Sequence, residues 1–369
     1  MPLLTYAQAR PWAKAFRDSS VSRKMPPWFA DPKYGHFAND PSLSQEQIDT
    51  LTAWANGGAP EGNPKDAPPP RVWPQGWNIA TPDAVFAMPK AFPIPAASAV
   101  PYQYIIVPTH FSEDKWIQQV EVRPGARASV HHAVVYIREP GSKWLADQPV
   151  NQAFGLPLSK GFTTSDVLMV YTPGNAFDEW KPGIAKKIPA GSDIVLQMHY
   201  TTNGDATQDL TRIGVVFAKE PPKQAILTLQ MGNDDFVIPP GDPNYSARVS
   251  GTVPNDALLL SLFPHMHLRG KGFEYRIAGP NGAVETLLKV DHYDFNWQLN
   301  YHLAQPRPLR AGTRLVWTGY FDNSANNPRN PDPKAEVRFG EQSWEEMMIG
   351  FFDVAVDAKI DKPTFFKRK

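Results

Sequence analysis

Proline accounts for 39 of the 369 residues and recurs along most of the chain, which limits how long any regular element can be. This frequency is roughly twice the average usage of about 5%. Because proline interrupts helices and is excluded from central strands, the density favours many short strands joined by ordered loops. A chain of 369 residues also exceeds one typical core, so two or three domains are expected.

Charge and cysteine content exclude several classes of protein. The 37 basic and 37 acidic residues cancel without a basic run, which argues against a nucleic acid or an anionic membrane as the partner. The chain has no cysteine, so disulfides, thiolate metal sites and a cysteine nucleophile are excluded. No apolar run reaches the length of about 18 residues that a membrane span requires.

Residues 1–65 are predicted to form a small helical segment. The stretch Ala7 to Arg17 is compatible with a helix, and Ser42 to Asn56 has helical periodicity. Ser44 and Gln47 have the spacing of a capping box, and a Gly-Gly pair ends the second helix. A proline-rich linker follows this helix.

From about Val72 onward the pattern changes to short β-type segments separated by proline and glycine. Many short strands are typical of sandwiches and barrels. We therefore expect a mostly β protein with two jelly-roll-like β-sandwich domains in tandem, at residues 66–220 and 221–369, behind the helical segment. The predicted strands are Tyr102–Val107, Trp116–Val122, Ala133–Ile137, Asp193–Tyr200, Ile213–Phe217, Ala225–Gln230, Leu258–Leu262, Phe273–Ile277, Thr286–Val290, Thr313–Tyr320 and Met347–Val356.

Four of the nine histidines fall in two tight clusters, His131-His132 and His265-Met266-His267. Alternate residues of a strand point to the same face, so the second cluster projects two imidazoles side by side. Neighbours in a strand point oppositely. Both members of the first cluster can therefore reach one metal only at a strand end or bulge, or through different ring nitrogens. Taken singly, each cluster is better explained by packing or a surface role than by metal binding.

Four segments, HHAVVY, LQMHYTTNG, FPHMHLRGKGF and SWEEMMIGFF, occur in the order found in copper type II, ascorbate-dependent monooxygenases. Residues 72–369 resemble this family, which includes peptidylglycine α-hydroxylating monooxygenase and dopamine β-monooxygenase. The resemblance implies two β-sandwich domains that each carry one copper and face each other across a water-filled cleft. The implied ligands are His131, His132 and His199 for an electron-transfer copper, and His265, His267 and Met347, with Met348 as the fallback, for the copper that reacts with dioxygen.

The function that the resemblance implies is hydroxylation of a C–H bond in a small substrate, using dioxygen and a reductant such as ascorbate. The catalytic residues would be His265, His267 and Met347. These ligand types suit copper, because three imidazoles accept both oxidation states and a thioether favours Cu(I). The family is exported, so we expect a periplasmic or secreted protein whose signal peptide lies outside this chain.

Two positions depart from the peptide-hydroxylating members of the family. Those enzymes carry an arginine two residues before the HxH motif and a tyrosine four residues after the ligand methionine. Phe263 and Phe351 occupy these positions here. A peptide with a C-terminal glycine is therefore not the expected substrate, and the two phenylalanines line an apolar pocket or pack in the core.

Residues 1–65 also resemble the distal part of a bacterial c-type cytochrome domain. The stretch KMPPW would supply Met25 as an axial haem ligand, but the chain lacks the CxxCH motif that attaches haem. We therefore expect a partial domain in which Met25 packs rather than ligates. Haem c would belong only to a longer parent chain, where a cytochrome would donate electrons to the copper domains.

Two other functions remain open. The first is a non-catalytic periplasmic β-sandwich protein that binds or delivers copper. The second is a cupin-like barrel with one metal held by an HxH motif, a further histidine and a carboxylate. The cupin-like reading leaves His131-His132 and Met347 unexplained.

Overall fold

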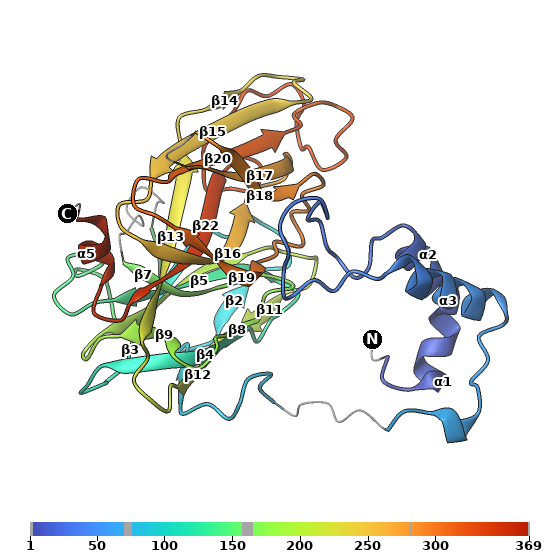
Figure 1. Ribbon diagram of the computed structural model, residues 1–369, viewed down its shortest axis with the longest axis horizontal. Helices are drawn as coiled ribbons and strands as arrows, with labels where there is room; N and C mark the ends of the chain where they lie inside the picture. Colours follow the sequence, from blue (N-terminus) through green and yellow to red (C-terminus); the bar gives the residue numbers. More distant parts are fainter. Residues whose placement is uncertain (1–2, 70–75, 157–164, 280–281, 368–369) are drawn as a thin grey trace. The chain divides into compact units, whose positions relative to one another are not determined.

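The computed structural model describes residues 3–69, 76–156, 165–279 and 282–367 (Figure 1). It is mostly β, with 42% of residues in strands and 10% in helices, which confirms the predicted fold class. The chain divides into a helical unit, Met1–Phe29 with Asn39–Gln75, and a β-rich unit, Ala30–Ala38 with Gly76–Lys369. The helical segment was predicted to span residues 1–65, but residues 30–38 within that range group with the β-rich unit.

The helical unit contains the helix predicted at residues 42–56. Helix α3 (Gln45–Asn56) begins at Ser44, whose side chain accepts a hydrogen bond from the backbone of Gln47 while the Gln47 side chain bonds back, so the capping box is confirmed. Met25 is 44% exposed, so the prediction that it packs is wrong. The other helices of this unit are α1 (Tyr6–Ala9), η1 (Arg10–Trp12), α2 (Ala13–Val21) and η2 (Pro64–Asp66).

The first β-sandwich packs two antiparallel layers around a core of branched aliphatic side chains, among them Val120 and Val135. One layer contains β1 (Ala84–Ala87), β12 (Arg212–Phe217), β4 (Lys115–Arg123) and β9 (Ile184–Ile188) in that order, with β8 (Phe177–Glu179) paired to β4. The facing sheet has the order β6 (Ala153–Gly155), β3 (Gln103–Pro108), β10 (Asp193–Tyr200), β5 (Val130–Arg138) and β7 (Asp166–Tyr171). The short strands β2 (Phe92–Ile94) and β11 (Thr207–Asp209) pair with each other.

The second β-sandwich has a core that includes Trp317 and Tyr275, both fully buried. One layer has the order β13 (Gln224–Asn233), β22 (Met348–Asp357), β16 (Ala257–His265) and β19 (Tyr301–Leu309). The facing sheet has the order β15 (Tyr245–Thr252), β20 (Arg314–Phe321), β17 (Gly270–Ala278) and β18 (Val284–Val290). The remaining elements are the pair β14 (Val237–Ile238) and β21 (Val337–Arg338), and helix α5 (Lys362–Phe366).

The two sandwiches are joined along one sheet. Strand β9 of the first pairs in parallel with β13 of the second, at Ile184 with Gln224 and Ala185 with Ala225. A single nine-stranded sheet therefore runs through both. Across from this junction, Val134 and Val170 of the first sandwich pack against a cluster that contains Phe263 and Phe351 of the second.

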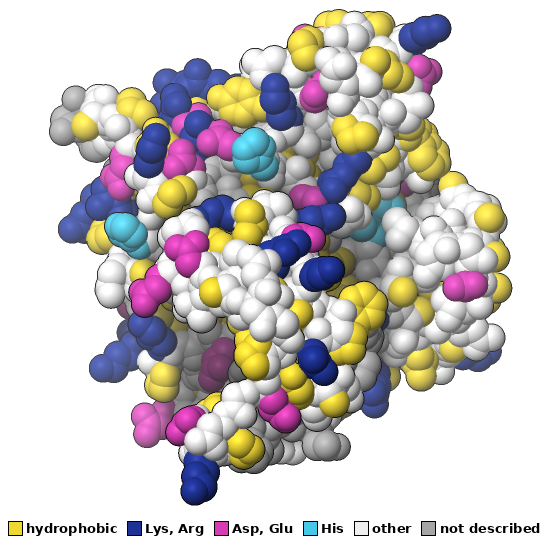
Figure 2. Space-filling view, turned by 90° about the vertical axis from the view of Figure 1, so that its right-hand side faces the viewer, with side chains coloured by type: hydrophobic (Ala, Val, Ile, Leu, Met, Phe, Trp, Pro, Cys, Tyr) yellow, Lys and Arg dark blue, Asp and Glu magenta, His cyan; other side chains and the backbone are white. Residues whose placement is uncertain are grey.

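Two further properties bear on partners. None of the helices in the described part of the chain is long and apolar enough to cross a lipid bilayer. On the face drawn in Figure 2, basic and acidic side chains are interspersed.

Candidate metal centre

The first predicted ligand set lies on two neighbouring strands. His131 and His132 are near the start of β5, and His199 is the penultimate residue of β10. His132 pairs directly with His199, but the next residue, Tyr200, pairs with Val130, so His131 is an extra residue in the ladder. This is the bulge that two adjacent histidines need, since a bulge re-aims side chains that would otherwise point to opposite faces.

The three imidazoles of this set fit one metal ion. Each offers a nitrogen, and these nitrogens lie within 4.8 Å of one another. The Nε2 of His132 is 3.1 Å from the Nδ1 of His199. Two ligands on one tetrahedral ion with bonds of about 2.0 Å are separated by about 3.3 Å. The spacing in the metal-free centre is therefore close to the spacing that coordination requires.

The second set begins where strand β16 ends. His265 is the last residue of β16, and His267 lies in the turn that leads to β17. Their ring centroids are 5.4 Å apart with the planes nearly perpendicular. His267 is 1% exposed, and neither of its ring nitrogens has a hydrogen-bond partner. A buried polar atom without a partner calls for an explanation, and a missing ion is one of the recognised ones.

The strand register distinguishes Met347 from Met348. His265 pairs with Ile349 of β22, and residues directly opposite in a ladder share a face. Met347 precedes Ile349 by two residues, so alternation assigns it to the face of His265. Met348 belongs to the opposite face, where a Cβ on Gly319 would lie 2.9 Å from the Met348 Cγ. The geometry thus favours Met347 over Met348 as the third ligand.

A buried carboxylate fixes the turn beside Met347. Glu346 is fully buried and accepts hydrogen bonds from the backbone N–H groups of His267, at 2.9 Å, and Arg269, at 2.5 Å. Burial raises the pKa of Glu346 to about 8, and those two N–H groups oppose the rise. The two hydrogen bonds hold the backbone of His267 against the residue that precedes Met347.

One short segment orients a histidine from each set. The Nε2 of His131 donates to the carbonyl oxygen of Phe295 at 3.1 Å, and the two rings stack with centroids 4.0 Å apart. The Nδ1 of His265 donates to the Oε1 of Gln298 at 2.7 Å. Because a carbonyl oxygen only accepts, these bonds leave a lone pair on the other ring nitrogen in each case. The sequence pattern singled out neither Phe295 nor Gln298 as a partner of the histidines.

All five histidines are buried and electrically neutral near pH 7. Burial lowers the pKa of His131 and of His265 to about 4 and that of His199 to about 3. The pKa values of His132 and His267 are lowered well below the ordinary value, again chiefly by burial. Neutral imidazole is the form that binds metals, so no proton must be removed before an ion enters at neutral pH.

The two sets adjoin each other directly. The ring centroids of His132 and His265 are 5.4 Å apart. The water-filled cleft that the family resemblance implied therefore does not separate these two rings, and this expectation needs correction.

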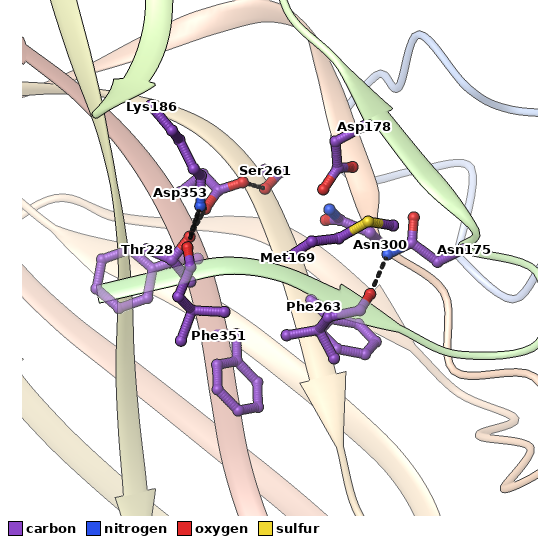
Figure 3. A pocket seen from close by; sticks show the side chains of 13 residues that line it. Met169, Asn175, Asp178, Lys186, Thr228, Ser261, Phe263, Asn300, Phe351 and Asp353 are labelled. Carbon is purple, nitrogen blue, oxygen red and sulfur yellow. Dashed lines mark hydrogen bonds and ion pairs between the residues drawn. The ribbon is translucent and has the colours of Figure 1, made fainter. Parts of the chain in front are cut away.

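A small chamber lined by residues of both sandwiches contains Phe263 and Phe351 together with several polar side chains (Figure 3). Its volume is about 20 Å³, which is room for about one water molecule. Phe263 and Phe351 line it with their rings stacked at 5.8 Å. Phe263 precedes His265 by two residues on β16, so the two share a face of the sheet. The pair of aromatic rings thus connects the chamber with the histidines.

Polar side chains gather on two sides of this chamber. On one side of Figure 3, the buried Lys186 forms an ion pair with Asp353 at 3.7 Å, and Ser261 donates to Asp353 at 3.1 Å. On the other side, Asp178 has a carboxylate oxygen without a hydrogen bond, 3.5 Å from the Nε2 of His302. Burial raises the pKa of Asp178. The chamber therefore offers one satisfied ion pair and one carboxylate able to accept a further hydrogen bond.

Comparison with known proteins adds nothing about the site. No protein-family model and no curated protein matches the sequence. Among solved structures, the chain is similar to that of broad bean stain virus, with 9% identity and a TM-score of 0.35, over 80% of this chain and 95% of that one. It is also similar to the major capsid protein P2 of bacteriophage PM2, with 8% identity and a TM-score of 0.30, over 70% of this chain and 98% of that one. At these values the likeness carries no argument about this chain.

Proposed function

We propose that this chain is a copper-dependent monooxygenase that hydroxylates a C–H bond of a small substrate with dioxygen and an external reductant such as ascorbate. The observation that supports it most is the convergence of five buried, neutral histidines from three separate sequence segments. Burying so many polar rings is costly unless their nitrogens gain partners. Metal ions supply those partners.

Copper is favoured by the kinds of ligand. Three imidazoles at His131, His132 and His199 suit copper in both oxidation states, while zinc would also fit such a set. The second set adds the thioether of Met347, which favours Cu(I) and is rare around zinc. Bound copper would supply one-electron transfer and the reaction with dioxygen.

The protein's own residues contribute orientation and exclusion of water. The Phe295 carbonyl and the Gln298 side chain hold His131 and His265 in single ring orientations. The apolar cluster that contains Val134, Phe263 and Phe351 includes a residue on the sheet face of His265, and it would keep bulk water from that side of the centre. A dry surrounding protects a reactive oxidant from side reactions.

The same cluster bears on the substrate. Phe263 and Phe351 offer no charged group, so a substrate carboxylate gains no ion pair at these positions. The group presented to the centre should therefore be apolar. The chamber that these two rings line has a volume of about 20 Å³, so it would not hold a substrate larger than about one water molecule without rearrangement.

Metal content tests this proposal first. After anaerobic loading with Cu(I) and desalting, we expect two coppers per chain, and one in a His265→Ala/His267→Ala variant. The loaded wild-type protein should consume dioxygen with ascorbate above the rate of free copper and couple that consumption to product with a suitable substrate. One metal per chain, or zinc alone, would defeat the proposal. Two coppers without coupled turnover across a substrate panel would instead support a protein that binds or delivers copper.

A further inference from the structure

The distances between rings do not distinguish the two ligand sets. Within the first set, the centroids of His131 and His132 are 5.5 Å apart. Within the second, those of His265 and His267 are 5.4 Å apart. Between the sets, the separation of His132 and His265 is also 5.4 Å. A histidine of one set is thus as close to the other set as it is to a member of its own.

His132 lies at the junction. Its ring also contacts that of His199, with centroids 4.8 Å apart, and its Nε2 is 3.2 Å from the hydroxyl of Tyr102. It is 4% exposed, so water does not surround it. The two sets therefore meet through a buried imidazole, with no layer of apolar side chains between His132 and His265.

We propose that the five histidines hold their two metal ions as one dinuclear centre, in which the ions share a small bridging ligand such as water or hydroxide. This inference rests on the proposed function, because both sets must bind copper. It goes beyond that function by assigning the two ions to one site. Two copper ions held in separate sites of tandem domains, without a shared ligand, would not couple magnetically.

Electrostatics makes such a pair dependent on oxidation state. The repulsion between two ions scales with the product of their charges, so it is about four times larger for two Cu(II) ions than for two Cu(I) ions at the same separation. A hydroxide bridge would offset part of the repulsion between Cu(II) ions. We therefore expect the second Cu(II) ion to bind with a larger loss of affinity relative to the first than the second Cu(I) ion does.

Electron paramagnetic resonance of the oxidised protein tests the pairing. In protein shown to hold two Cu(II) ions per chain, a bridged pair should give an integrated signal well below two spins, or a half-field transition from two nearby spins. The matched controls are His265→Gln/His267→Gln, which should hold one copper with a full one-spin signal, and His131→Gln/His199→Gln, which should do the same from the other set.

The outcomes separate this inference from the proposed function. Two coppers per chain with a full two-spin signal and no half-field transition would overturn the dinuclear centre and leave the monooxygenase proposal standing. Fewer than two coppers in the wild-type protein would overturn both. A reduced signal in wild type with full signals in both double variants would support the dinuclear centre. Because each variant keeps one set intact, its copper content also reports whether it has folded.

Discussion

The two ligand sets rest on different kinds of local structure. In the first, backbone register between β5 and β10 sets His132 opposite His199, and a bulge turns His131 toward them. In the second, His265 ends a strand and His267 follows in a turn. The first set is thus positioned by a hydrogen-bonded ladder with many members. In the second, only His265 belongs to a ladder, and the turn at His267 depends on a few individual side chains.

This difference predicts unequal sensitivity to substitution. A ladder that loses one contact is still held by its remaining backbone bonds. A turn that loses a buried partner leaves an unsatisfied group, which costs about 1–3 kcal/mol and lets the turn relax. We therefore expect single substitutions around His265, His267 and Met347 to affect metal binding more than those around the first set.

The largest effect should follow loss of the thioether. Met347→Ala should lower the Cu(I) affinity of the second set by more than about 100-fold, since loss of even an indirect partner costs about 10–100-fold. Turnover should disappear while the first set stays loaded. Copper content and dioxygen consumption measure both.

Met348→Ala is the matched control for Met347→Ala. Met348 is fully buried in the sandwich core, so its loss should cost about 2–5 kcal/mol of stability and leave two coppers per chain. If Met348→Ala instead removed one copper and Met347→Ala did not, the assignment from register would be wrong.

The stability of the metal-free protein should fall in acid. Burial lowers the pKa of His131 and His265 from 6.5 to about 4, so the unfolded chain takes up protons first as the pH drops. Relative to its protonated form, each neutral ring adds of the order of 3 kcal/mol to the free energy of unfolding above about pH 6.5. This contribution declines toward pH 4 and is absent below it. For His199, whose pKa is lowered to about 3, the decline continues further.

Urea unfolding of the metal-free protein between pH 4 and pH 8 measures this dependence. Replacing His131 and His199 by glutamine should remove more of the pH dependence of the unfolding free energy than replacing His265 alone. A free energy of unfolding that does not change over this range would contradict the buried, neutral state of the rings.

A smaller effect is expected at the segment that orients both sets. Gln298→Leu removes the acceptor for the Nδ1 of His265 and should weaken copper binding to the second set by about 10–100-fold. Gln298→Glu keeps an acceptor at this position and should restore most of the affinity. Competition with a Cu(I) chelator measures the change, and equal losses in the two variants would indicate a packing role instead.

The smallest effect is expected at Tyr102. Its hydroxyl is 3.2 Å from the Nε2 of His132 and its ring stacks on His199 at 4.8 Å. Tyr102→Phe keeps the stacking, and the ladder still holds both histidines. We expect copper affinity of the first set to change by less than about 10-fold. A loss of copper affinity as large as that of Gln298→Leu would contradict the expected difference in sensitivity between the two ligand sets.

Local β-type patterns predicted many strands but missed others, and regular alternation does not separate the two groups, since the predicted β10 is buried almost throughout while the missed β15 alternates. All eleven predicted strands coincide with observed ones, and β10 has the predicted bounds. Strand β19 was missed because it contains Pro306 and Pro308. Its place at the edge of the nine-stranded sheet explains why proline is tolerated there. An edge position depends on the whole topology, which a local pattern does not reveal.

The same limit applies to the metal centre. For His131 and His132 to reach one metal, alternation required a strand end, a bulge or the use of different ring nitrogens, and the register shows a bulge. The contact between His131 and Phe295 joins residues 164 positions apart, and no spacing in the local sequence predicts it. Two adjacent methionines are indistinguishable until the pairing of β16 with β22 is known. The copper itself and the reaction stay predictions.

The parallel pairing of β9 with β13 has a practical consequence for dissecting this protein. A gene cut near residue 220 would leave each half with a strand edge that has lost its neighbour. Exposed edges of this kind recruit other chains and promote aggregation. Neither sandwich should therefore express well alone. Co-expression of the two halves, with the partner present to cover each edge during synthesis, is the better route to a split protein.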